Sequence, residues 1–114
     1  MSTAWEQLFA ATVVLASSGP IKQRLVDAYR THLVTLDRDE LPKELREEFC
    51  SLSNCMCAVR PLRGESAEQA TVRKMSDIEA SQVATRIVNM LGAVVRLQMF
   101  QQRGPKLRAV GSED

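Results

Sequence analysis

The pattern of apolar and polar positions is helical along most of the chain, and it is strongest in the last third. Between Ser76 and about Gln102, apolar residues recur at alternating spacings of four and three, as on one face of an α-helix. These are Val83, Ile87, Met90, Val94 and Leu97. A second stripe beside them consists of Ala84, Val88, Leu91 and Val95. A helix that is apolar over so wide an arc must be covered on several sides. The pattern therefore predicts either the central helix of a bundle or a helix shared with a second subunit.

Signals at both ends set the expected limits of this long helix. Ser76 and Glu79 have the spacing of a capping box, and Gly104-Pro105 is typical of a helix end. We expect a single helical domain over residues 1–103 and a polar, disordered tail over residues 104–114. Gly92, in mid-helix, costs about 1 kcal/mol relative to alanine. That cost favours a close helix crossing at Gly92, either within the chain or between subunits.

Three further helices are predicted upstream. The first runs from Thr3 to Ser17, and its apolar face is formed by Trp5, Leu8, Phe9, Thr12, Val13 and Ala16, widened by Ala11 and Leu15. Gly19-Pro20 ends it, and Pro20 suits the first position of a second helix that reaches about Leu36. The connection is short enough to make the two an antiparallel hairpin. The third helix begins near Pro42, ends before Pro61, and repeats Leu45, Phe49, Leu52, Met56 and Val59.

The predicted fold is an all-α antiparallel bundle of four main helices plus one short helix, with a long C-terminal helix. The short helix would begin at Ser66 in the irregular stretch 60–75. Composition agrees, since the 114 residues are 45% hydrophobic but only 4% aromatic. At 1.5 Å per residue the long helix spans roughly 40 Å against about 22–27 Å for the others. It should therefore extend beyond the bundle and leave apolar surface there.

Charge is nearly balanced overall but unevenly distributed. The formal net charge of +1 lacks the basic excess that nucleic-acid and anionic-membrane partners favour. Residues 37–48 hold six acids and three bases, whereas residues 80–112 hold five bases and no acid. Opposite charges at two ends of a small protein can steer self-association. Two solvated faces are the simpler interpretation.

The candidate chemical groups indicate no reaction. Cys50, Cys55 and Cys57 are separated by five and two residues, so they do not share one helix face, and ordinary packing is favoured over a metal site. His32 lacks the neighbours that a phosphotransfer histidine needs. We expect no catalytic residue, no metal and no cofactor. Three cysteines in a chain of this size, with no convincing export or membrane segment, favour reduced thiols in a cytoplasm.

The leading functional hypothesis is a non-catalytic helical interaction module, an adaptor or regulatory subunit, that acts as a homodimer. An apolar patch rimmed by arginine is typical of a protein interface. The predicted partner-binding residues are Arg96, Leu97, Met99, Phe100 and Arg103. One alternative is a nucleic-acid-associated regulator that uses the basic C-terminal end. A second is a small enzyme or ligand binder with a crevice at Tyr29, His32, Arg86 and Asn89. The general character of the chain suggests a bacterial protein.

Overall fold

The regular structure is helical throughout the part of the chain that the computed structural model describes, which is residues 3–112 for the backbone and residues 3–99 for side chains. No strand occurs in residues 3–112. The α-helices are α1 (Ala4–Leu15), α2 (Ile21–Ala28), α3 (Lys43–Met56), α4 (Ala67–Arg73) and α5 (Asp77–Ser112). A π-helical turn, η1 (Tyr29–Leu33), continues α2, and a 3-10 turn, η2 (Arg38–Glu40), precedes α3. The predicted all-α class is confirmed, and residues 3–112 contain five α-helices.

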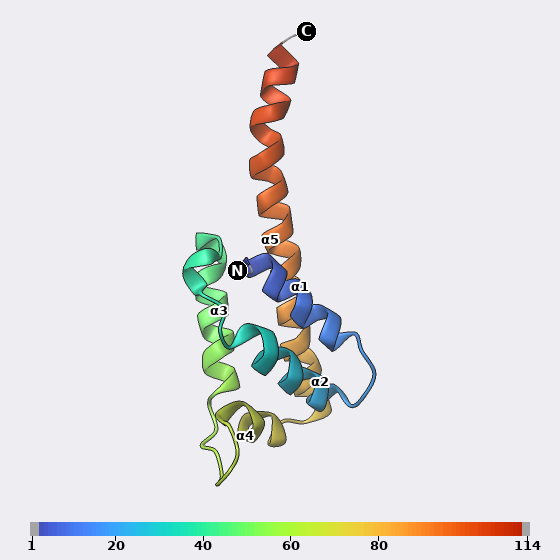
Figure 1. Cartoon of the computed structure of the whole chain (residues 1–114), viewed down its shortest axis with the longest axis vertical. Helices are drawn as coiled ribbons and strands as arrows, with labels where there is room; N and C mark the ends of the chain where they lie inside the picture. The colour runs from blue at the N-terminus through green and yellow to red at the C-terminus, as the bar shows by residue number, and fades with distance from the viewer. Residues whose placement is uncertain (1–2, 113–114) are drawn as a thin grey trace.

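The arrangement is a short body from which one helix projects (Figure 1). α1 and α2 run in opposite directions across α5, α3 lies along one side, and α4 lies at the end of the body away from the projection. The molecule measures 65 × 27 × 25 Å, and its radius of gyration is 16.8 Å, against about 13 Å for a compact domain of this length. We call residues 100–112 of α5 the projecting segment. The predicted extension of the long helix beyond the bundle is confirmed.

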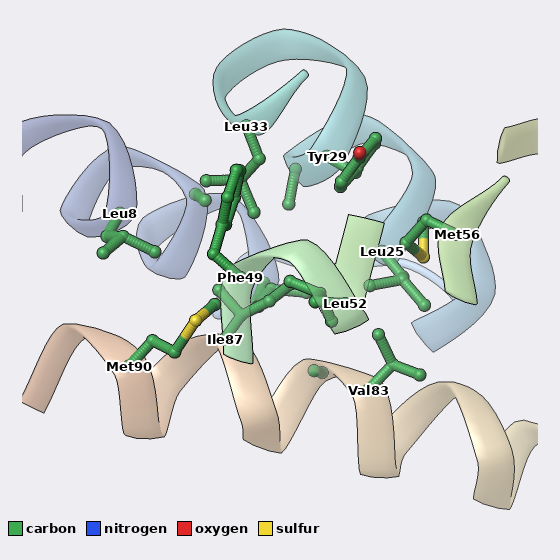
Figure 2. Close-up of a cluster of buried hydrophobic side chains, with 14 of the residues drawn as sticks. Leu8, Leu25, Tyr29, Leu33, Phe49, Leu52, Met56, Val83, Ile87 and Met90 are labelled. Carbon is green, nitrogen blue, oxygen red and sulfur yellow. The ribbon is translucent and has the colours of Figure 1, made fainter. Parts of the chain in front are cut away.

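The core of the body is formed where α5 meets the other helices (Figure 2). Four of the five residues of the first predicted stripe are buried, namely Val83, Ile87, Met90 and Val94, while Leu97 is half-buried. They pack with fully buried side chains of the other elements, among them Leu8, Leu25, Leu33, Leu52 and Met56. Each such side chain contributes about 1.5–3 kcal/mol on burial. The first half of α5 is therefore the centre of the body.

Short polar contacts fix the helix ends. Capping boxes begin α1 (Thr3 with Glu6), α4 (Ser66 with Gln69) and α5 (Ser76 with Glu79). Between α1 and α2, Gly19 has a φ of 110°, a conformation that L side chains rarely adopt. Arg24 then donates to the carbonyls of Gly19 (2.8 Å) and Leu15 (2.6 Å). These bonds satisfy acceptors that the end of α1 leaves open.

Helix ends are where the structure differs from the sequence prediction. α5 continues through Gly104-Pro105 to Ser112, beyond the predicted end. Glycine and proline raise the free energy of a helix by about 1 and 3 kcal/mol, and proline removes one hydrogen bond, but neither excludes a helix. α3 ends at Met56, three residues before the last residue of its predicted stripe, Val59. The domain limits stay a prediction, and Glu113 and Asp114 lie outside the described residues.

Candidate interaction surface

α1 buries only part of the apolar face predicted for it. Its buried residues are Ala4, Leu8, Ala11 and Leu15. Trp5, Phe9 and Val13 are 37%, 52% and 53% exposed. The physical reason is that α1 is apolar almost all round and turns Ala4 and Ala11 inward, since small residues let helix axes approach. The bulky side chains are left in a row on the outside.

These outward side chains lie one turn apart, at positions i, i+4 and i+8 of the helix. The rings of Trp5 and Phe9 meet edge to face, with 6.2 Å between their centroids. The capping box holds this row in place, because Thr3 N donates to Glu6 Oε1 (2.8 Å) and Glu6 N donates to Thr3 Oγ1 (3.3 Å). We call Trp5, Phe9 and Val13 the α1 stripe.

α5 has an exposed face beside its buried one. Val88 and Met99 are 43% and 47% exposed, and Val95, between them at helical spacing, is half-buried. Near the start of the same helix Ile78 is 71% exposed. The second stripe predicted from the sequence is thus only partly covered within the chain, because Ala84 is buried whereas Leu91 is half-buried. α5 retains apolar area that the body does not cover.

The α1 stripe and this face of α5 meet at a shallow hollow of about 290 Å³, which is lined by Trp5, Val95, Gln98 and Met99. The hollow lies where α5 leaves the body. Trp5 and Met99 bring mostly apolar atoms to it, and Gln98 adds a polar edge. Together, the α1 stripe, the hollow and Val88 form what we call the interaction surface, and the backbone of the projecting segment continues α5 beyond it. A group of neighbouring exposed apolar side chains is typical of a binding site.

Among the residues predicted to bind a partner, Arg96 and Met99 are exposed and Leu97 is half-buried. The side chains of Phe100 and Arg103 lie outside the described part of the chain. Met99 belongs to the hollow, whereas the guanidinium of Arg96 lies back over Gly92, 3.4 Å from where a Cβ would be. A partner site at these residues stays a prediction. The predicted residues do not include the α1 stripe, for which the alanines at positions 4 and 11 were the available signal.

The predicted ligand crevice is composed of residues with separate neighbours. Tyr29 is buried in the core, where burial raises the pKa of its hydroxyl above the ordinary value. His32 accepts a hydrogen bond through its backbone carbonyl from Gln7 Nε2 (3.1 Å). Arg86 donates to Glu48 (2.8 Å) and Ser51 (3.1 Å), which ties α5 to α3. Asn89 is exposed. A site that unites these four stays a prediction.

The cysteines are free thiols in different surroundings. Cys50 Sγ accepts a hydrogen bond from Arg38 Nη1 (3.3 Å), Cys55 packs partly against the core, and Cys57 is exposed. Within the described residues, no three His, Cys, Asp or Glu are grouped closely enough to hold a metal ion. The same part of the chain has no helix both long and apolar enough to cross a membrane.

The interaction surface is therefore the feature on which a functional argument can be built. The chain matches no family model, no curated protein and no solved structure.

Proposed function

We propose that the chain is a non-catalytic protein–protein interaction module, an adaptor or regulatory subunit, that acts as a homodimer through its interaction surface. One observation carries the proposal above the others. α5 leaves the body next to α1 (Figure 1). An apolar face of α5 and the neighbouring α1 stripe are exposed there. The surface so formed is apolar and aromatic at its centre, as the cores of protein interfaces are.

The projecting segment needs a covering partner for a thermodynamic reason. Isolated helices shorter than about 12–15 residues are marginal in water even with favourable sequences. The projecting segment, residues 100–112, contains Gly104 and Pro105, which disfavour a helix further. Contacts with another surface would supply the missing free energy, since packing of an apolar face is the main source of helix stability in proteins.

Charge supports a second copy of this chain as that partner. The projecting segment carries Arg103, Lys106 and Arg108 and no acid. The acid-rich stretch 37–48 forms η2 and the start of α3, at the end of the body from which α5 emerges (Figure 1). Each copy therefore offers a basic helix and an acidic shoulder. Such complementary potentials steer the encounter of two copies.

The test is the mass in solution by size-exclusion chromatography with light scattering. At about 100 μM we expect twice the monomer mass of 12.7 kDa, within the affinity range of transient homodimers. Phe9→Lys introduces a charge into the α1 stripe and should give the monomer mass. The control is Val34→Lys, which changes an exposed apolar residue outside the surface, 49% accessible. It should leave the dimer intact. A monomeric wild-type protein contradicts the proposal.

A second candidate, a nucleic-acid-associated regulator, is favoured by the three bases on the projecting segment. Binding through them should weaken steeply with added salt and be lost when Arg103, Lys106 and Arg108 are all changed to Gln. A gel-shift titration that stays flat at low salt would dismiss this candidate. For either function the expected setting is a reducing cytoplasm, in agreement with three free thiols, and a bacterial source stays a prediction.

A further inference from the structure

The contacts of the described side chains do not explain why position 92 of α5 is a glycine. A glycine in mid-helix costs stability relative to alanine, so it is usually kept where another group comes close. A Cβ built on Gly92 would meet one group among the described residues, the end of the Arg96 side chain at 3.4 Å, which is ordinary contact with a flexible group. Among the described side chains, no atom of another helix lies within 4 Å of that Cβ position. The sequence allows a helix crossing at Gly92 either within the chain or between subunits. Among the described residues, no crossing within the chain accounts for the glycine.

Gly92 lies on the side of α5 that carries the interaction surface. It lies one turn after Val88, one turn before Val95 and two turns before Met99, so all four share one side of the helix. Val88 and Met99 are exposed and Val95 is half-buried. A glycine within an exposed apolar row lets a second helix approach closely at that point.

We infer that two copies of α5 pair in antiparallel orientation about a two-fold axis at Gly92, so that each projecting segment lies along the first turns of its partner's α5. The inference rests on the proposed homodimer and adds its geometry. In a two-fold crossing, residues equally far before and after Gly92 lie level with each other. Val88 of the partner subunit is then level with Val95 and Arg96, beside the hollow that Trp5 and Met99 line.

Charge favours this register over others. Asp77 lies fifteen residues before Gly92 and Lys106 fourteen residues after it. The basic end of each helix therefore lies level with the acidic first turn of the other, where Asp77 and Glu79 are exposed. In the same first turns, Ile78, Ser81 and Thr85 line a shallow hollow, of about 290 Å³, that can receive side chains of the partner. Antiparallel helix dipoles add to the match.

Gly92→Ala tests the crossing with effects of opposite sign. Alanine should raise the urea midpoint of the monomer measured at high dilution, because it favours the helix. It should raise the Kd of the dimer at least about tenfold, because both copies place a methyl group at the closest approach. Asn54→Ala is the matched control, since it improves helix propensity at an exposed position of α3 and should leave the Kd unchanged. A dimer of Gly92→Ala with a Kd within about twofold of wild type overturns the crossing.

A charge exchange tests the orientation. Asp77 and Lys106 of one chain are about 43 Å apart along a continuous helix, so they can interact only between copies. Lys106→Glu and Asp77→Lys should each raise the Kd about three- to tenfold at low salt, and the double variant should return it to within about twofold of wild type. The control pair Lys106→Glu with Asp27→Lys, which changes an exposed acid of α2, has the same net charge and should show no recovery.

The outcomes separate the inference from the proposed function. A wild-type protein that stays monomeric at about 100 μM removes both. A wild-type dimer whose Asp77 and Lys106 variants have additive effects, with no recovery in the double variant, keeps the homodimer and overturns the antiparallel pairing.

Discussion

Thr71 shows how one polar side chain connects the irregular part of the chain to a helix. It is buried in α4, where its hydroxyl donates to the carbonyl of Ala67 (2.8 Å) and accepts from the backbone N–H of Val59 (3.1 Å). The second bond anchors the stretch that follows α3. Buried backbone groups are rarely left unpaired, so this N–H depends on Thr71.

Thr71→Val should therefore destabilise the protein by about 1–3 kcal/mol, because it keeps the shape of the side chain but leaves the Val59 N–H without an acceptor. The measurement is urea unfolding followed by circular dichroism. Thr71→Ser retains the hydroxyl and should cost only about the value of the lost methyl group, near 1 kcal/mol. Equal losses for the two variants would show that the hydrogen bond is unimportant.

At the same scale, the residues of α1 mark what the sequence could and could not predict. The capping pair Thr3 and Glu6 has the expected spacing and fixes where α1 begins. The buried face was predicted only in part, because apolar residues surround most of the helix and hydrophobic periodicity then has no single direction. Ala4 and Ala11 are buried because small residues allow α1 to pack closely against the body. The exposed Phe9 and Val13 are the consequence.

Among the elements, the helices themselves followed from periodicity and capping, but their ends and irregularities did not. α2 continues as the π-turn η1, in which the N–H of Val34 donates to the carbonyl of Tyr29 (2.9 Å). The wider turn shifts the following residues around the helix, and Tyr29, Leu33 and Leu36 are all buried. A regular 3.6-residue pattern contains no signal for this shift, because it arises from packing against the rest of the body.

The projecting segment of α5 gives a prediction at the scale of the element. If its helix depends on the second copy, dilution below the Kd should unfold up to thirteen of the 114 residues while the body stays folded. The ellipticity at 222 nm should then fall by roughly a sixth on dilution, since most of the signal comes from the helices of the body. A variant truncated after Met99 removes this segment and should show no such fall. A wild-type signal independent of concentration would mean that the projecting helix is stable alone or absent throughout.

The shape of the whole molecule offers the broadest check of the interface. One chain has a long axis of 65 Å. A dimer that crosses at Gly92 overlaps nearly the whole of both α5 helices, so its long dimension should stay near 65–75 Å. Contact through the tips of the projecting segments would instead give about 100 Å. Small-angle X-ray scattering of the dimer distinguishes the two, and a maximum dimension near 100 Å would contradict the Gly92 crossing.

The all-α class and the extension of α5 beyond the bundle followed from the sequence because both depend on local periodicity and on relative helix lengths. Which surface stays uncovered did not follow. Coverage depends on how α1, α2 and α3 distribute themselves around α5, and this is a property of the assembled body (Figure 1). For this reason the sequence placed Trp5 on the apolar face of the first helix, whereas the structure leaves it exposed.

The packing of α1 against α5 also has a consequence for biosynthesis. These helices lie far apart in the chain, and α1 is made first. Leu8 and Leu15 become fully enclosed only after Ile87, Met90 and Val94 have left the ribosome. A growing chain therefore holds its first helix against α2 and η1 but without α5 for most of translation, at roughly 5–20 residues per second. Products that stop before Val94 would keep those leucines exposed, and quality-control proteases could recognise them as unfinished.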